Sequence, residues 1–268
     1  MNLLVTGAAG YIGASFSYEA LKKGFKVFGC DNFINSDEKN IKILENKFPN
    51  NFIFEKIDLS TELEKVKNFI SNKQIECVIH FASLKSVEES EKIPNEYWRN
   101  NLDSTFNVLK AMEDEGLKAL VFSSSASVYG QSKIETEDYL IKNADKFNSI
   151  ILRYFNVAGA DPKLRSGLIS KEPTHLIKIL SEVAVGKRDK IYLYGNDYNT
   201  DDGTAVRDYI HVSDLADIHI KTAEYLIEKK VSNIFNCGYG RGYSVLEVVK
   251  EANKITGDKI KYEFSNRR

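Results

Sequence analysis

Three glycines near the amino terminus have the spacing of a phosphate-binding turn. Gly7, Gly10 and Gly13 follow a short apolar run and precede residues with helical periodicity. Glycine permits a tight turn and a close approach of the backbone to a pyrophosphate, and the start of the following helix supplies unpaired N–H groups and partial positive charge. This strand–turn–helix context predicts a cradle for the phosphates of a dinucleotide.

A carboxylate further along the chain refines this prediction. Asp31 ends the apolar run 26–30, roughly 20 residues after the glycines, where a carboxylate accepts hydrogen bonds from the adenosine ribose and repels a 2′-phosphate. We therefore expect NAD in preference to NADP. Asp58 follows the next apolar run, and for it both a contact with adenine and a plain turn or capping role remain open.

A second group of reactive side chains lies near the middle of the chain. Ser123–Ser125 ends another apolar run, and Tyr129 and Lys133 follow, four residues apart. This spacing places Tyr129 and Lys133 on one face of a helix. A tyrosine with a pKa of ~10 is a poor base at neutral pH, but a neighbouring ammonium and a positive nicotinamide ring favour its phenolate. The pattern therefore predicts a tyrosine base tuned by a lysine beside the cofactor.

The elements that position these residues alternate along the first half of the chain. Between short apolar runs lie stretches such as 11–23 and 61–73, where apolar residues recur three or four positions apart. This alternation predicts βαβ units and a parallel sheet, whose carboxyl edge collects the side chains described above. The strand-like runs are 3–5, 26–30, 51–54, 76–80, 118–123 and 149–153.

Local signals mark several helix ends. Thr61 with Glu64, and Ser244 with Glu247, have the spacing of a capping box, in which the two side chains satisfy each other's backbone N–H groups. Gly257 stands where the helix after Ser244 is expected to end.

Together these observations predict an α/β fold with a Rossmann-like, doubly wound parallel sheet and a smaller mixed α/β substrate-binding lobe. We assign residues 1–155 to the NAD-binding domain, with returning segments near 190–235. Residues 156–268 form most of the substrate-binding lobe, because the stretch from about 156 to 210 is richer in loop-forming residues.

Composition narrows the function classes. The chain has 268 residues, of which 43% are hydrophobic, and 37 basic residues nearly balance 38 acidic ones. This balance gives no bulk attraction to nucleic acid or to a membrane surface. Three scattered cysteines and the lack of a long apolar run favour a cytoplasmic protein. The four histidines lack metal-ligand spacing, so no metal is expected, and His80 is expected in the core.

With these motifs the chain resembles the extended short-chain dehydrogenase/reductase family, and within it the UDP-hexose 4-epimerases. The resemblance runs through nearly the whole chain in order. The segments that carry it are Val5–Gly13, Asp31-Asn32, Val78–Ala82 with Lys85, Asn100-Asn101, Phe122–Gly130, Arg153–Gly159, Gly195–Tyr198 and Val206–Val212.

The resemblance implies an activity. It is the NAD-dependent epimerisation at C4 of a UDP-hexose, UDP-galactose to UDP-glucose, through a transient 4-keto intermediate. In this hypothesis the Tyr129 phenolate removes the proton of the 4′-hydroxyl and Ser125 hydrogen-bonds the same oxygen, while hydride passes to NAD and returns to the other face. A homodimer formed through two helices is also implied.

The same resemblance assigns roles residue by residue. The catalytic residues it implies are Ser125, Tyr129 and Lys133. The residues it implies for NAD are Gly7, Gly10, Tyr11, Ile12, Gly13, Asp31, Asn32, Asn35, Ser36, Asp58, Leu59, Phe81, Ala82, Lys85, Asn100, Ser125, Tyr129, Lys133 and Phe155. The residues it implies for the UDP-sugar are Lys85, Ser125, Asn156, Leu176, Arg207 and Arg268.

Two features depart from the family pattern. The family usually has two Tyr-Gly pairs separated by a loop, whereas here the single pair Tyr129-Gly130 serves both positions. The chain also stops at Arg267-Arg268, which resembles the paired arginines before a final segment of the substrate lobe. We therefore expect a C-terminally truncated lobe.

Other functions stay open at this point. A nucleotide-sugar dehydratase would need an acidic pair after the serines, and residues 126–128 provide none. A nucleotide-sugar reductase would release its reduced cofactor. A non-catalytic NAD-binding protein is the alternative if the catalytic tyrosine and the tail are missing. Whether UDP-N-acetylhexosamines are accepted depends on the volume of the pocket.

Overall fold

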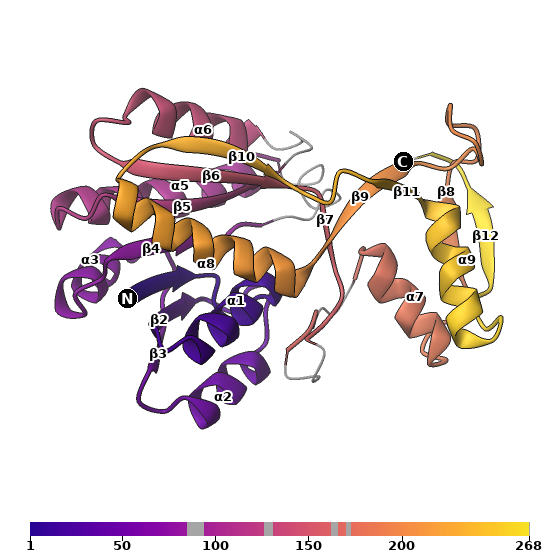
Figure 1. Cartoon of the computed structure of the whole chain (residues 1–268), viewed down its shortest axis with the longest axis horizontal. Helices are drawn as coiled ribbons and strands as arrows, with labels where there is room; N and C mark the ends of the chain where they lie inside the picture. The colour runs from indigo at the N-terminus through magenta and orange to yellow at the C-terminus, as the bar shows by residue number, and fades with distance from the viewer. Residues whose placement is uncertain (85–93, 126–130, 162–165, 170–172, 268) are drawn as a thin grey trace. The chain divides into compact units, whose positions relative to one another are not determined.

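The computed structural model describes residues 1–84, 94–125, 131–161, 166–169 and 173–267, and the chain divides into two compact units (Figure 1). The first unit comprises Met1–Tyr154, Ala160–Ile169 and Val212–Cys237. The second unit comprises Phe155–Gly159, Ser170–His211 and Gly238–Arg268.

Seven parallel strands form the sheet of the first unit, in the order β10-β6-β5-β4-β1-β2-β3. The strands are β1 (Asn2–Thr6), β2 (Lys26–Asp31), β3 (Phe52–Lys56), β4 (Cys77–His80), β5 (Ala119–Ser125), β6 (Asn148–Tyr154) and β10 (Asn233–Cys237). The helices are α1 (Tyr11–Lys22), α2 (Glu38–Lys47), α3 (Leu63–Asn72), α5 (Pro94–Asp114), α6 (Gln131–Lys142) and α8 (Val212–Lys229). Strands β2 and β3 are added on one side of β1, and β4, β5, β6 and β10 on the other. This is the strand order of a doubly wound Rossmann sheet, so the predicted fold class is confirmed.

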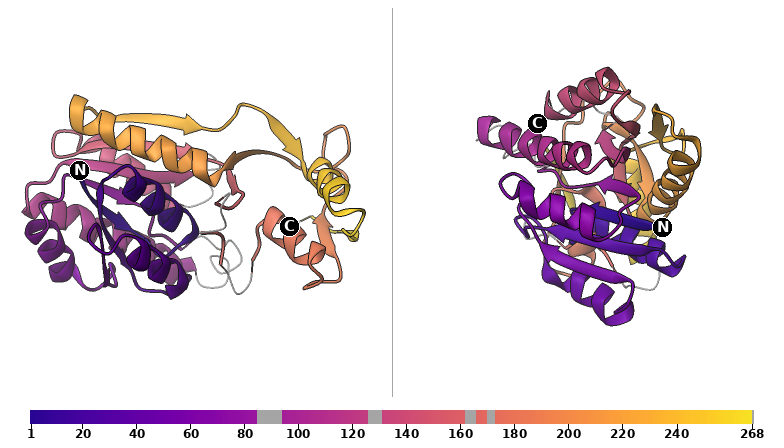
Figure 2. Two further views of the ribbon diagram at one scale, coloured as in Figure 1. Left: turned by 60° about the horizontal axis from the view of Figure 1, so that its bottom comes forward. Right: turned by 90° about the vertical axis from the view of Figure 1, so that its left-hand side faces the viewer.

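Helices lie on both faces of this sheet, which explains why its central strands are continuous apolar runs (Figures 1 and 2). On one face, Leu4, Val78 and Leu120 belong to the same buried cluster as residues of α3, α5 and α6. On the other, α1 and α8 pack against each other and against the strands. The carboxyl ends of all seven strands consequently meet at one edge, where the candidate site lies.

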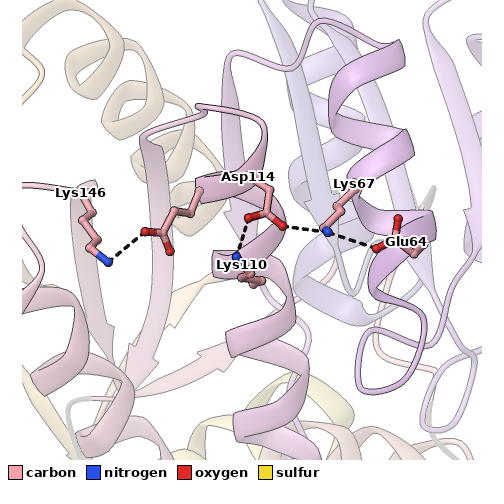
Figure 3. Close-up of polar contacts among 6 residues, drawn as sticks. Glu64, Lys67, Lys110, Asp114 and Lys146 are labelled. Atoms are coloured by element: carbon pink, nitrogen blue, oxygen red, sulfur yellow. Dashed lines mark hydrogen bonds and ion pairs between the residues drawn. The ribbon is translucent and has the colours of Figure 1, made fainter.

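Charged side chains link the helices at the surface of this unit. Lys67 on α3 contacts Asp114 at the end of α5 at 2.8 Å and Glu64 at 3.1 Å, and Asp114 also pairs with Lys110 (Figure 3). Lys146, after α6, pairs with an α5 carboxylate at 2.9 Å. Solvent screens pairs of this kind, so they contribute little to stability and do not determine the packing.

The described part of the second unit contains two small sheets and two helices. A three-stranded sheet has the order β11-β9-β7, and a parallel pair joins β12 to β8. The two helices and β8 share a core that includes Leu180, Leu193 and Val249. Gly257 ends its last helix in the left-handed conformation, with φ 68°, as expected. Its elements are β7 (Asn156–Ala158), α7 (Leu176–Ala184), β8 (Ile191–Tyr194), β9 (Val206–His211), β11 (Gly242–Ser244), α9 (Val245–Thr256) and β12 (Tyr262–Ser265).

The division of the chain differs from the expected one at residues 190–211. These residues form β8 and β9, which pair only with strands of the second unit, so the segment that returns to the parallel sheet is 212–237. Within the described part of the chain, no helix is long and apolar enough to cross a membrane.

One predicted capping box is confirmed and the other is wrong. The Ser244 hydroxyl accepts the Glu247 N–H at 3.0 Å, and the Glu247 carboxylate accepts the Ser244 N–H at 2.6 Å. At α3 the N-cap is Glu62 and not Thr61. The Glu62 carboxylate accepts the backbone N–H of Asp58 at 2.8 Å, and this turn shifts the start of the helix by one residue.

A partly buried ion pair ties α6 to the sheet. The Glu137 carboxylate, whose side chain is 8% exposed, accepts a bifurcated hydrogen bond from Arg153 Nε on β6, at 3.1 and 3.0 Å, and a second hydrogen bond from Arg153 Nη2. The Ser124 hydroxyl at the end of β5 donates to the same carboxylate. Because buried carboxylates require such partners, this contact fixes α6 relative to β5 and β6.

Replacing Glu137 by alanine is expected to destabilise the protein by about 3 kcal/mol, because it leaves Arg153 and Ser124 without their acceptor. Urea denaturation gives the free energy of unfolding. The matched control is Asp114→Ala in the surface network, for which we expect a much smaller loss because solvent screens its charge. Equal losses in the two variants would contradict this interpretation.

Candidate functional site

The glycine turn between β1 and α1 has room for backbone only. Gly7 adopts φ 67°, and a Cβ atom there would lie 2.9 Å from the backbone nitrogen of Ala82. A Cβ atom on Gly13 would lie 2.2 Å from the carbonyl oxygen of Gly7. The N-cap of α1 is Gly10, and its first turn carries no acidic side chain. The turn therefore leaves the positive end of α1 accessible to an anion.

Side chains from β2 and α2 hold this turn in place. The Asp31 carboxylate accepts the Ala9 N–H at 3.1 Å, and the buried Asn40 amide donates to the Ala9 carbonyl at 3.0 Å. Asp31 also accepts the Phe33 N–H at 2.8 Å and the Ser36 hydroxyl at 2.9 Å. Asp31 thus holds the glycine turn and the loop after β2, where we predict that the adenosine of NAD binds. Asn40 was not predicted, because a helical asparagine gives no sequence signal for a contact 31 residues away.

A cavity of about 310 Å³ borders these loops, and the residues that line it include Asn32, Asp58 and Lys56. Partial burial tends to raise the pKa of Asp58, but hydrogen bonds from Ser60 and Asn32 outweigh it and lower that pKa. Asp58 is consequently a carboxylate acceptor beside the cavity and at the same time caps its own turn. The two roles left open for it from the sequence are compatible.

The segment after β4 lies against the glycine turn. Phe81 packs against Phe16 and His219 with ring centroids 5.6 and 4.8 Å apart, and the Ala82 N–H donates to the Thr6 hydroxyl at 3.2 Å. Asn101 on α5 binds both backbone groups of Leu84, at 2.7 and 3.1 Å. Asn101 thus makes a structural contact with this segment, whereas its neighbour Asn100 stays a predicted NAD contact.

Lys133 is fixed at the end of β5. Its ammonium donates to the Ser123 carbonyl at 2.9 Å and lies 4.6 Å from the centroid of the Phe122 ring. Burial lowers the pKa of Lys133 to about 8. Ser125 is the last residue of β5, in register with Tyr154 on β6. The site thus holds a lysine whose proton is lost readily, close to the serine-rich strand end.

The side chain of Ser123 belongs to a second, neutral hydrogen-bonded group. Ser123 Oγ is 3.0 Å from His219 Nε2, and His219 Nδ1 is 2.8 Å from the Leu215 carbonyl. Burial lowers the pKa of His219 to about 4, so the ring donates from Nδ1 and accepts at Nε2. Burial also raises the pKa of Tyr154 to about 12, against a hydrogen bond with Ser123. The floor of the site is therefore uncharged at neutral pH.

The remaining predicted residues fall into three groups. In the first unit, Tyr11 and Leu59 are buried, Ile12 is half-buried on α1 and Asn35 is exposed in the loop after Asp31. In the second unit, Asn156 pairs in register with Tyr209, Leu176 begins α7, Arg207 is exposed on β9 and Phe155 is exposed just before β7. Tyr129, Lys85 and Arg268 lie outside the described residues.

Burial raises the pKa of Tyr209, and a hydrogen bond between its side chain and that of Asn156 opposes this effect. Asn156 and Arg207, both predicted to bind the UDP-sugar, therefore flank the same tyrosine of β9. Among the residues that the structure describes, no three His, Cys, Asp or Glu side chains are grouped to hold a metal ion.

The anion-accepting turn after β1, the carboxylate after β2 and the serine–lysine contact after β5 define a dinucleotide-binding α/β protein. Comparison with known proteins identifies its family. The model of the NAD dependent epimerase/dehydratase family matches residues 3–143 and 131–238, and the chain belongs to this family. The epimerase resemblance inferred from the motifs is confirmed.

Relatives named UDP-glucose 4-epimerase match the whole chain. The one from Bacillus subtilis (strain 168) is 40% identical over 295 residues, covering 100% of this chain and 86% of the relative. The one from Bos taurus is 38% identical over 301 residues, covering 100% and 85%.

Solved structures show the same fold. The UDP-glucose-4-epimerase from Stenotrophomonas maltophila, with bound NAD and formylated UDP-arabinopyranose, has a TM-score of 0.95 and 34% identity. The match covers 100% of this chain and 87% of that structure. The enzyme from Bifidobacterium longum in complex with NAD+ and UDP has a TM-score of 0.92 and 35% identity, with the same coverage.

These alignments also bear on the single Tyr-Gly pair. The Bacillus subtilis alignment spans 295 positions, although this chain has 268 residues, so the relative carries segments that this chain lacks. The two parts of the family match overlap at residues 131–143, which are α6 and its end. The overlap falls immediately after Tyr129-Gly130, where the sequence departs from the family pattern.

Gly13→Ala is expected to abolish detectable NAD binding, because the added methyl would overlap the Gly7 carbonyl and force the turn apart. Isothermal titration with NAD measures the change. Gly167→Ala is the control, since its Cβ would meet only the Ala160 methyl at 3.7 Å. Unchanged NAD affinity in Gly13→Ala would show that the turn does not bind the cofactor.

The lowered pKa of Lys133 predicts a pH dependence of stability. Above about pH 8 the folded protein loses this proton, whereas the unfolded chain keeps it up to its ordinary pKa of 10.5. Unfolding then takes up a proton, so the free energy of unfolding rises with pH in this window. Relative to Lys133→Met, the wild type should gain stability between pH 8 and pH 10, with an upper bound of about 1.4 kcal/mol per pH unit.

Urea denaturation of both proteins at several pH values measures this difference, and Lys142→Met, an exposed lysine on the same helix, is the control. A difference that is flat or falls with pH would contradict the assigned burial effect.

Proposed function

We propose that this protein is a UDP-glucose 4-epimerase that interconverts UDP-galactose and UDP-glucose with NAD as its cofactor. The observation that carries the proposal is the match of the entire chain to proteins of that name at 38–40% identity. The parallel sheet adds support, because its carboxyl edge brings together the glycine turn, Asp31 and the serine end of β5.

The residues present fit NAD. The backbone cradle at Gly7 and Gly13 would hold the pyrophosphate on the N-terminus of α1, and Asp31 would accept the ribose hydroxyls and repel a 2′-phosphate. Bound NAD supplies a reversible two-electron oxidation of the sugar at C4. The remaining chemistry falls to the side chains of this chain.

In the proposed mechanism, Tyr129 is the base that takes the 4′-hydroxyl proton and Ser125 hydrogen-bonds the same oxygen. Lys133 lowers the pKa of that tyrosine through its positive charge. The Ser123 carbonyl keeps Lys133 in place, and the uncharged His219 contacts the hydroxyl of the same serine. When the proton returns from Tyr129, the 4-keto sugar has presented its other face, and the configuration at C4 is inverted.

We assign the dinucleotide to the first unit and the UDP-sugar to the second, where Asn156, Leu176 and Arg207 lie. The guanidinium of Arg207 suits a diphosphate and the Asn156 amide suits uracil or phosphate edges. UDP-N-acetylhexosamines remain candidate substrates.

We also include a homodimer and a cytoplasmic location in the proposal. Support for the dimer comes from α5 and α6, which pack side by side through Phe106 and Tyr139, with centroids 5.0 Å apart. Exposed apolar side chains on these two helices, which include Trp98, Ile134 and Ile141, are of the kind that interfaces bury.

The purified protein is expected to interconvert UDP-galactose and UDP-glucose while NAD stays bound. Tyr129→Phe should lower kcat by roughly 10²–10⁴-fold, because it removes the acid–base group, and should retain NAD. A coupled assay for UDP-glucose and the absorbance of bound NAD(H) measure the two quantities.

The control is Tyr225→Phe, an exposed tyrosine on α8 that should leave kcat unchanged. Wild-type protein that binds NAD but leaves UDP-galactose unconverted would favour a non-catalytic NAD-binding protein. Release of NADH during turnover would instead indicate a reductase or dehydrogenase.

A further inference from the structure

One buried histidine, His80, has no role in the proposed mechanism and contacts the residue before Gly7. His80 ends β4 and is 1% exposed. Its Nδ1 is 2.9 Å from Thr6 Oγ1 on β1, and its Nε2 is 3.1 Å from Thr105 Oγ1 on α5. Both threonines are buried, so each polar atom in this group requires a partner within the protein.

The surrounding bonds fix the direction of every proton in the group. Thr105 Oγ1 donates to the Asn101 carbonyl at 2.8 Å, so it must accept a proton from His80 Nε2. His80 Nδ1 is then the acceptor, and Thr6 Oγ1 donates to it while accepting the Ala82 N–H at 3.2 Å. A single neutral tautomer, protonated at Nε2, satisfies the whole chain.

A chain of hydrogen bonds connects the segment after β4 to Asn101 on α5, and the Asn101 side chain bonds back to the same segment. It runs from the Ala82 N–H through Thr6, His80 and Thr105 to the Asn101 carbonyl. The Asn101 side chain then binds the N–H and the carbonyl of Leu84. The segment 82–84 is therefore held at both ends by a network with His80 at its centre.

This segment also lies against the glycine turn, because a Cβ atom on Gly7 would come within 2.9 Å of the Ala82 backbone nitrogen. We propose that His80 is a positioning residue for NAD, which fixes the segment 81–84 against the glycine turn and so sets the positions of Phe81 and Ala82. This inference rests on the proposed function, in which those two residues contact the cofactor.

The neutral state that the network needs is maintained by the surroundings. His80 stacks on the Phe122 ring, with centroids 5.9 Å apart, and Lys133 lies over the same ring at 4.6 Å. Burial and the positive charge of Lys133 lower the pKa of His80 to about 3. The His80 ring consequently stays neutral, donating a hydrogen bond from Nε2 and accepting one at Nδ1, and does not act as an acid or base.

Two variants break the network at different points. His80→Phe keeps a ring against Phe122 but removes both nitrogens, and Thr105→Val keeps the shape of the threonine but removes its hydroxyl. Leu109→Ala, also buried on α5, is the control for loss of stability alone. Titration calorimetry measures NAD affinity, and hydrogen exchange with mass spectrometry measures the protection of residues 81–84.

In both His80→Phe and Thr105→Val we expect the Kd for NAD to rise about tenfold or more and the exchange of residues 81–84 to accelerate by a similar factor. The kcat at saturating NAD should stay within about threefold of wild type. The double variant should bind NAD no more weakly than His80→Phe alone, because the chain is already broken. Leu109→Ala should leave both the Kd and the exchange unchanged.

If Thr105→Val folds and shows wild-type NAD affinity and wild-type exchange at residues 81–84, the inference is overturned. The same conclusion follows if Leu109→Ala reproduces the effects, because they would then report stability only. A wild-type protein that binds NAD without epimerising UDP-galactose would overturn the proposed function and leave the role of His80 intact.

Discussion

The arrangement of the candidate site depends on one steric constraint, which is the close approach of three backbone segments at the end of β1. A Cβ on Gly13 would come 2.2 Å from the Gly7 carbonyl, and one on Gly7 would come 2.9 Å from the Ala82 nitrogen. The turn, the start of α1 and the segment after β4 are therefore in direct backbone contact. Because β1 is flanked by β2 and β4, this contact sets the geometry of the edge on which the other site residues lie.

Both buried histidines at this edge are neutral, in contrast to the charged pair of Glu137 and Arg153 beside β5. His219 and His80 have lowered pKa values and are neutral, each with both ring nitrogens engaged. Lys133 lies at the end of β5, where its ammonium is hydrogen-bonded to the Ser123 carbonyl and not to a carboxylate. An ammonium held this way keeps its field available to a neighbouring phenol, which a salt bridge would have reduced.

Local sequence signals predicted part of this arrangement. The glycine turn, the strand ends and the Ser244 capping box depend on residues within a few positions of one another, and all were recognisable. Asn40, Asn101 and His219 could not be predicted, because their partners lie far along the chain and depend on how helices cross the sheet. The contact of Asn101 with Leu84 is separate from the role in NAD binding that the resemblance implies for Asn100, which stays a prediction.

Residues 190–211 differ from expectation for a related reason. A short apolar run such as 191–194 carries no information on which sheet it joins, and β8 pairs with β12, about 70 residues later in the chain. Pairing over such a distance is decided by tertiary packing. The parallel strands β1 to β5 were easier to assign, because each is followed by a helix.

Contacts with the sheet place Lys133, although the sequence departs from the family pattern just before α6. Glu137 anchors this helix through Arg153 and Ser124, and Lys133 is bonded to the Ser123 carbonyl. All of these contacts are made by residues of α6, β5 and β6. The cation that would activate the proposed tyrosine base is therefore held by the same strand that carries the serine end of the site.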